Sequence, residues 1–91
     1  MGAYWVYILK CSDGSLYTGC TSDLTRRLAD HTSGRASKYT RSRLPVTLSY
    51  AEPAADRGSA LRREVQIKTL SRNGKLRLCE GYQAKKKYSI R

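Results

Sequence analysis

Phenylalanine is absent from this 91-residue sequence, which also has only one histidine, one tryptophan, one methionine and two prolines. Uninterrupted apolar runs are short, and none approaches the roughly 20 residues that a membrane-spanning helix needs. No charged segment precedes an apolar stretch at the N-terminus, so no secretion signal is indicated. We therefore expect no membrane partner and an intracellular location, in the cytoplasm or nucleoid of a bacterium or in the host cell of a virus.

Paired cysteines are also missing, because Cys11, Cys20 and Cys79 form no Cys-x-x-Cys spacing. The odd number excludes a disulfide framework, and the spacing excludes a zinc site of the zinc-finger kind. We expect all three thiols to be reduced and to act as small apolar groups. A chain of this length folds as a single domain with a modest core.

Acidic residues are scarce, with 7 against 18 basic ones and a net charge of +11. Such an imbalance indicates a polyanionic partner. The excess is localised, because residues 35–44 hold four basic and no acidic groups, and residues 62–91 hold ten basic and two acidic groups. The first 34 residues are neutral overall. We therefore expect a nucleic acid to be bound by one loop and by the C-terminal third.

The N-terminal part of the chain predicts a β-hairpin. Residues 5–9 and 16–20 are rich in aromatic and β-branched side chains, and Asp13-Gly14 between them predicts a tight turn with positive φ angles. Tyr7 and Tyr17 lie on the two predicted strands. Gly19 packs no side chain in its strand, which indicates either a bulge or a place where another backbone approaches closely.

The next segment predicts a helix over residues 24–31, with N-cap side chains before it. At about 100° per residue, Leu24, Leu28 and His31 share one face. Arg27 borders that face, whereas Arg26 points to water. The spacing therefore assigns different roles to two adjacent arginines.

Residues 35–43 have no periodicity and predict an irregular loop that grips phosphates. A tyrosine ring in this loop could stack on a base, and the expected nucleic-acid contacts are Arg35, Lys38, Tyr39, Arg41 and Arg43. The alternative is a solvated loop whose charges do nothing specific. Residues 46–51 alternate in polarity and predict a third strand.

A turn-rich link over residues 52–58 precedes a second predicted helix, residues 59–70, with Ser59 as its N-cap. Its apolar face is formed by Leu61, Val65, Ala60 and Ile67, Glu64 lies within that face, and Arg62 and Arg63 point away. A carboxylate on a buried face needs a charge partner or a metal ion. The spacing leaves both open: a metal site, or a structural ion pair with Arg27.

Beyond Gly74 the sequence predicts a short helix over residues 75–80 and then a mobile basic tail. The predicted organisation is thus a folded domain over residues 1–80 and a flexible tail over residues 81–91. The expected nucleic-acid contacts in this part of the chain are Lys68, Lys85, Lys86 and Lys87.

Taken in order, these segments resemble a known family. The matching residues are Val6-Tyr7-Ile8-Leu9, Leu16-Tyr17-Thr18-Gly19, Asp23-Leu24 with Arg27-Leu28 and His31, Lys38-Tyr39-Thr40 followed by Arg41, Arg43 and Pro45, and Ala60 to Glu64 with Ile67-Lys68. The chain resembles the GIY-YIG nuclease domain, most closely its small single-domain members. The resemblance implies an α/β fold of α+β layers, with a small three-stranded antiparallel sheet flanked by helices.

The same resemblance implies a metal-dependent endonuclease that hydrolyses DNA phosphodiester bonds with Mg²⁺ or Mn²⁺. Similarity to the Slx-type nuclease domain suggests branched or flapped DNA, in repair or recombination. By position, the implied catalytic residues are Tyr7, Tyr17, Arg27, His31 and Glu64, with Glu64 as the metal ligand. Either tyrosine could act on the water, and His31 could relay a proton or simply hold the site together. No small-molecule cofactor is implied.

A second class of function fits the same charge pattern. A non-catalytic nucleic-acid-binding module would use the same hairpin, loop and tail to grip a phosphate backbone. Glu64 favours the enzyme, because a pure phosphate binder gains nothing from an acid that faces its groove. A basic structural protein, with neither pocket nor metal dependence, is the third alternative.

Overall fold

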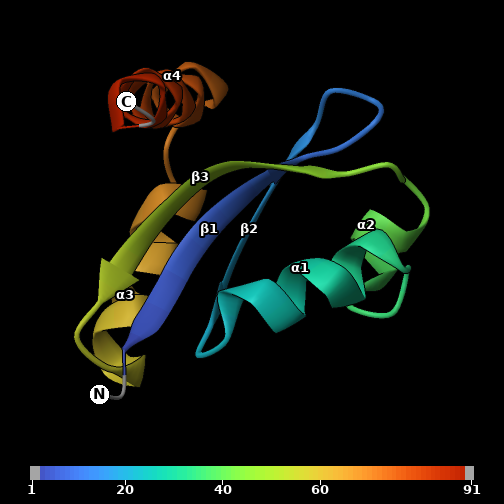
Figure 1. Ribbon diagram of the computed structural model, residues 1–91, viewed down its shortest axis with the longest axis horizontal. Coiled ribbons are helices and arrows are strands. Elements are labelled where there is room, and N and C mark those ends of the chain that lie inside the picture. Colours follow the sequence, from blue (N-terminus) through green and yellow to red (C-terminus); the bar gives the residue numbers. More distant parts are fainter. Residues whose placement is uncertain (1–2, 90–91) are drawn as a thin grey trace.

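The computed structural model describes residues 3–89, with side chains up to residue 84 (Figure 1). The described elements are, in order, β1 (Tyr4–Lys10), β2 (Leu16–Thr21), α1 (Leu24–Thr32), α2 (Lys38–Arg41), β3 (Thr47–Ala54), α3 (Arg57–Lys68) and α4 (Arg72–Ser89). The strands form one antiparallel sheet in the order β2-β1-β3. The predicted three-stranded α+β architecture is confirmed.

β1 is the central strand, and its side chains alternate between two buried layers. Val6 and Ile8 face α3 and α4, where they pack with Ala60, Ile67 and Cys79. Tyr7 and Leu9 point to the other face, where they pack with Cys11, Val46, Leu24 and Leu28. Figure 1 shows α1 in front of the strands and α3 behind them. Because both faces are covered, β1 is almost continuously apolar and aromatic.

The hairpin is present, but its turn differs from the prediction. Gly14 N–H donates to the Cys11 carbonyl at 2.9 Å. Within this turn, only Gly14 takes the left-handed conformation, with φ of 85°. The Asp13 carboxylate accepts from the Ser15 N–H at 3.0 Å. This Asx-type bond keeps Asp13 at negative φ, so the two-residue primed turn is wrong and residues 11–15 form a longer connection.

The helix predicted over residues 24–31 is confirmed as α1, with Asp23 as N-cap. The loop predicted at residues 35–43 is not wholly irregular, because residues 38–41 form the single helical turn α2. Ser37 caps that turn by accepting from the Thr40 N–H at 3.1 Å. A capped turn this short is too brief to show a helical period in sequence.

Helix α3 starts at Arg57, because Asp56 rather than Ser59 is its N-cap and accepts the Ser59 N–H at 2.8 Å. Its buried face is narrower than the sequence predicts. Ala60 and Ile67 are fully buried as expected, whereas Leu61 is 38% and Val65 60% exposed. Glu64 still lies on the buried stripe, since positions 60, 64 and 67 follow the i, i+4, i+7 rule.

Helix α4 is longer than the sequence predicts. Ser71 accepts from the Gly74 N–H at 3.1 Å, so Gly74 lies in the first turn rather than at a break. The helix then passes through Gly81 to Ser89. Residues 81–89 are therefore helical and continuous with the domain, in place of the predicted tail; the side chains of Lys85, Lys86 and Lys87 lie outside the described part. No helix among residues 3–89 has the length and apolarity to cross a membrane.

Candidate active site

Tyr7 and Gly19 face each other on paired strands β1 and β2. Tyr7 is 1% exposed. A Cβ atom on residue 19 would lie 2.6 Å from the Tyr7 hydroxyl oxygen and 2.8 Å from Cζ. These distances are far below any normal contact, so only glycine lets the Tyr7 ring lie across β2. The predicted close approach at Gly19 is thus found, and its cause is a tyrosine side chain.

The Tyr7 hydroxyl begins a buried chain of polar groups. Its oxygen lies 2.9 Å from His31 Nε2, and His31 Nδ1 lies 2.9 Å from Thr40 Oγ1. His31 and Thr40 are both fully buried. Thr40 Oγ1 in turn lies 2.9 Å from Ser37 Oγ. The sequence identified Tyr7 and His31 as site residues, whereas it placed Thr40 only within the matching run Lys38-Tyr39-Thr40 and gave it no role.

Arg27 approaches the same hydroxyl from α1. It is half-buried, while Arg26 is exposed, as the helical spacing predicts. Its Nε atom is buried and has no partner in the part of the chain that the structure describes. The interaction with the Tyr7 hydroxyl raises the pKa of Arg27. A polar hollow opens beside it, lined by Thr21, Ser22, Asp23, Arg26, Arg27 and Asp30.

Burial sets the protonation of this cluster. It raises the pKa of Tyr7 to about 12, although the neighbouring Arg27 acts in the opposite direction. Burial, assisted by the charge of Arg27, lowers the pKa of His31 below its usual 6.5. At neutral pH, Tyr7 therefore keeps its proton and His31 is uncharged.

Tyr17 lies at the outer edge of the cluster and is half-buried. Its ring meets His31 edge-on at a centroid distance of 5.3 Å and stacks on Tyr39 at 5.9 Å. The Arg43 guanidinium covers Tyr39 at 3.8 Å from the ring centroid, and Arg43 Nε is 3.0 Å from Asp13 Oδ2. Tyr39 and Arg43, predicted as nucleic-acid contacts, are thus already engaged with protein groups.

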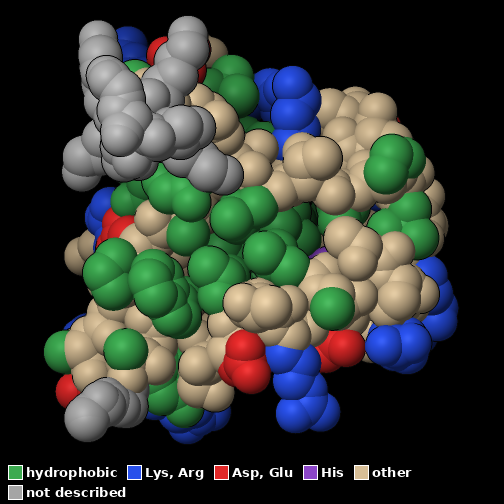
Figure 2. Space-filling model, in the orientation of Figure 1, with side chains coloured by type: hydrophobic (Ala, Val, Ile, Leu, Met, Phe, Trp, Pro, Cys, Tyr) green, Lys and Arg blue, Asp and Glu red, His purple; other side chains and the backbone are tan. Residues whose placement is uncertain are grey.

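Three other predicted contacts, Arg35, Lys38 and Arg41, are exposed and surround a second hollow beside α2. Arg35 is also 3.8 Å from Asp30, a weak pair at such exposure. In Figure 2 the middle of this face is hydrophobic and basic side chains lie around its rim. A polyanion could therefore reach these three side chains without rearrangement of the fold.

Glu64 lies apart from this cluster, on the α3 face of the sheet. Its side chain is 17% exposed, and Oε2 pairs with Lys68 Nζ at 3.4 Å. The Cys20 thiol donates to Oε1 at 3.9 Å. Cys20 follows Gly19 in β2, so the backbone of this strand separates Glu64 from the Tyr7 ring. The predicted alternative, an ion pair with Arg27, is not formed among the described residues.

Two other side chains of α3 differ from the predictions. Arg63, predicted to point away, is half-buried and its Nε pairs with Glu52 Oε2 at 3.0 Å. Lys68, predicted as a nucleic-acid contact, is the ionic partner of Glu64. Within residues 3–89 there is no group of three or more His, Cys, Asp or Glu side chains that could hold a metal ion. A metal ion bound by Glu64 would therefore take most of its other ligands from water or substrate.

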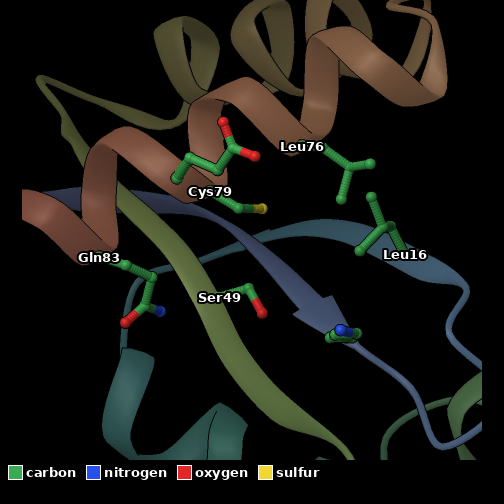
Figure 3. Close-up of a pocket in the computed structure, with 7 residues that line it drawn as sticks. Leu16, Ser49, Leu76, Cys79 and Gln83 are labelled. Atoms are coloured by element: carbon green, nitrogen blue, oxygen red, sulfur yellow. The ribbon is translucent and has the colours of Figure 1, made fainter.

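A separate hollow lies between α4 and the sheet, away from the Tyr7 cluster (Figure 3). Leu76, Cys79 and Gln83 of α4 face Leu16 of β2 and Ser49 of β3 across it, and Lys10 and Glu80 complete the lining. It brings together none of the residues that the sequence singled out as catalytic.

The chain is similar to known proteins over most of its length. The family model described as the GIY-YIG catalytic domain matches residues 3–77. The chain belongs to the GIY-YIG family. The match covers β1, β2, α1, α2, β3 and α3, and so includes every residue of the Tyr7 cluster and Glu64. The predicted resemblance is confirmed, and a place in this nuclease family follows from it.

Relatives of this GIY-YIG chain are small proteins. A UPF0213 protein of Staphylococcus haemolyticus is 48% identical over 80 residues, which are 88% of this chain and 98% of that protein. The solution NMR structure of the UPF0213 protein BH0048 of Bacillus halodurans has a TM-score of 0.56 at 44% identity, covering 86% of this chain and 83% of that one. The solution NMR structure of protein EF2693 of E. faecalis has a TM-score of 0.57 at 33% identity, covering 100% of this chain and 91% of that one.

Proposed function

We propose that this GIY-YIG chain is a metal-dependent endonuclease that hydrolyses DNA phosphodiester bonds. The observation that carries the proposal is Arg27, whose buried Nε has no partner among the described residues and whose guanidinium lies between Tyr7 and a polar hollow. A buried cationic donor without an acceptor is costly, and a phosphate oxygen is the natural partner of its planar fork. Membership of the family supports the same chemistry.

The roles of the side chains follow from their exposure. Arg27 binds the scissile phosphate and stabilises the negative charge that develops on it. Tyr17, at the open edge of the cluster, directs its hydroxyl toward the attacking water. Tyr7 keeps its proton and therefore orients rather than deprotonates, while His31 holds the Tyr7 hydroxyl from behind.

Glu64 is the proposed ligand of Mg²⁺, with Mn²⁺ as an alternative. One carboxylate suffices, because Mg²⁺ in proteins usually keeps several waters and takes further ligands from the substrate phosphate. Its partners in the structure, an i, i+4 lysine and a thiol, are both weak enough to be exchanged. When bound, the ion supplies Lewis-acid stabilisation and an acidified water. Glu64 would hold it, and Lys68 would be released toward the DNA.

The substrate is proposed to be DNA with a branch or flap, processed inside the cell in repair or recombination. Arg35, Lys38 and Arg41 form an exposed basic group beside the cluster. They are suited to a backbone that continues past the scissile phosphate, and Lys85, Lys86 and Lys87 would extend the contact. A junction presents two such backbones at an angle, which one continuous duplex does not.

A non-catalytic DNA-binding module remains the second candidate, and one observation favours it. Glu64 lies on the opposite face of the sheet from Tyr7 and is paired with Lys68. If that ion pair never opens, the chain has the phosphate-binding groups of the family without a metal ligand. The two candidates differ in what Glu64 does, so that residue decides between them.

The deciding experiment incubates the chain with labelled linear, nicked, flapped and branched DNAs in Mg²⁺, Mn²⁺ or chelator. We expect cleavage with metal only, best on the branched forms. Glu64→Gln keeps side-chain length and should abolish cleavage without weakening DNA binding, and Arg27→Ala should lower the rate by about 100-fold or more. Arg26→Ala is the matched control and should cleave normally.

The outcomes separate the two candidates. Cleavage by Glu64→Gln at the parent rate in Mg²⁺ contradicts Glu64 as the metal ligand. No cleavage by the parent on any of these DNAs, together with tight binding, favours the non-catalytic module. Equal losses in Arg27→Ala and Arg26→Ala would contradict the assignment of Arg27.

A further inference from the structure

The buried chain Tyr7–His31–Thr40–Ser37 constrains where its hydrogens lie. Each hydroxyl donates one hydrogen bond, and neutral imidazole donates from one nitrogen and accepts at the other. His31 uses both nitrogens, at 2.9 Å each, toward Tyr7 and Thr40. All the hydrogens in the chain must therefore run in one direction, either from Tyr7 toward Ser37 or the reverse.

In the first direction every buried hydrogen has an acceptor. The Tyr7 hydroxyl donates to His31 Nε2, His31 Nδ1–H donates to Thr40 Oγ1, and Thr40 donates to Ser37 Oγ at 2.9 Å. Ser37 Oγ also accepts the Thr40 N–H. Only the Ser37 hydrogen is left over, and Ser37 is half-buried, so that hydrogen can reach water.

In the reverse direction one buried hydrogen has no acceptor. His31 Nε2–H would donate to the Tyr7 oxygen, and the Tyr7 hydrogen would need another partner. Tyr7 is 1% exposed, and the guanidinium of Arg27 beside it has only donors. A buried hydroxyl hydrogen without a partner is energetically costly. The first direction is therefore the stable one.

We propose that Thr40 is a positioning residue that fixes the proton of His31 on Nδ1. Nε2 is then free to accept from Tyr7, and the Tyr7 oxygen keeps its lone pairs for Arg27 beside it. The placement of the His31 proton follows from the hydrogen bonds alone. Its effect on cleavage rests on the proposed nuclease function, in which Tyr7 orients the reacting groups.

Removal of the Thr40 hydroxyl abolishes the preference. In Thr40→Val the side-chain shape is kept, but His31 Nδ1–H would be buried without an acceptor, so either tautomer now leaves one buried hydrogen unpaired. Part of the protein then carries the proton on Nε2, where it donates to the Tyr7 oxygen. Thr40→Ser keeps the hydroxyl and is the matched control.

Nitrogen NMR of the protein labelled with nitrogen-15 histidine tests this directly, because His31 is the only histidine in the sequence. Near neutral pH we expect a protonated Nδ1 and a bare Nε2 in the parent and in Thr40→Ser, and a mixture of both tautomers in Thr40→Val. Tyr7→Phe removes the other partner and should keep the proton on Nδ1. A parent with the proton on Nε2, or a Thr40→Val protein with the proton on Nδ1 alone, overturns the proposal.

These measurements need no substrate, so they separate this proposal from the nuclease itself. If Thr40→Val does not fold, the position of the His31 proton in the parent and in Tyr7→Phe decides whether the proposal holds. If the parent cleaves DNA, Thr40→Val should lower the rate at least about tenfold, as expected for loss of a group that orients a catalytic side chain, and Thr40→Ser should restore it. A full rate in Thr40→Val would overturn the positioning role even if the proton has moved.

Discussion

Tyr7 contacts three other residues of the candidate site. Its ring lies against Gly19, its hydroxyl bonds to His31, and its oxygen lies beside Arg27. Two elements, β2 and α1, are thus held against the central strand by one residue. A change at any of these neighbours should therefore also alter the packing or hydrogen bonding of Tyr7.

Gly19 offers the simplest test of this packing. Gly19→Ala should lower the free energy of unfolding by about 1–3 kcal/mol, because the added Cβ would overlap the Tyr7 ring. Gly81→Ala is the matched control: nothing lies within 4 Å of its Cβ position in α4, so it should be more stable by up to about 1 kcal/mol. Thermal or denaturant unfolding of both variants provides the comparison. A Gly19→Ala protein as stable as the parent would contradict the close approach.

The two tyrosines should differ in their effect on cleavage. Tyr17→Phe removes only the hydroxyl at the open edge of the site, and we expect its rate to fall by about 100-fold, as for loss of a group that acts on the water. Tyr7→Phe should lose less rate but more stability, because it leaves His31 Nε2 without its buried partner. Single-turnover cleavage and thermal melting measure both. The opposite ranking of rates would make Tyr7 the residue that acts on the water.

Helical spacing in the sequence separated Arg27 from Arg26 and placed Glu64 on a buried stripe, because both follow from the 3.6-residue period alone. The same spacing puts Leu61 and Val65 on the buried face together with Ala60 and Ile67, but the sheet leaves the first two outside. It gives Thr40 no role, because the partner of Thr40, His31, is nine residues away and is reached only through the folded connection. Residues that form polar contacts across such a connection show no regular spacing in the sequence.

The strands and the first helix could be predicted because apolar alternation and capping residues mark them locally. Helix ends were harder to place. Asp56 and Ser71 are N-caps whose role depends on which N–H points at them in the fold. The short helix α2 was predicted as loop, yet it is the element that presents Lys38 and Arg41 beside the cluster.

The basic group around α2 should control the salt dependence of DNA binding. Replacing Arg35, Lys38 and Arg41 with glutamine should reduce the slope of log affinity against log salt by up to about 0.9 for each phosphate that the variant no longer neutralises. The matched control removes the same charge from exposed positions of the other layer, at Arg57, Arg62 and Arg77. Binding titrations over several salt concentrations measure the slopes. Equal slopes in the two triple variants would mean that only net charge matters.

The molecule as a whole is arranged in two layers, and Glu64 lies in a different layer from the proposed phosphate-binding groups. The layer of α1 and α2 carries Arg27, His31 and the exposed basic group, while the layer of α3 carries Glu64. The edge strand β2 lies between the two layers: Gly19 lies against Tyr7 of one layer, and the adjacent Cys20 contacts Glu64 of the other. A phosphodiester at that edge could be reached from both sides, which explains how one carboxylate and one arginine on opposite faces could serve one bond.

Acid should destabilise the whole fold through His31. Its pKa is lowered in the folded chain by burial and by Arg27, so the unfolded chain binds a proton first as pH falls below 6.5. Stability should therefore be complete above that value and decline from there toward the lower folded pKa. The pKa values of Asp13 and Asp56 are lowered from 3.8, by their bonds to Ser15 and Ser59, so the stabilisation they contribute is lost only at more acidic pH. Melting temperatures between about pH 7.5 and about pH 5 should fall for the parent but change little for His31→Asn, which is less stable throughout. A parent whose melting temperature stays constant over this range would show that His31 is not held neutral by the fold.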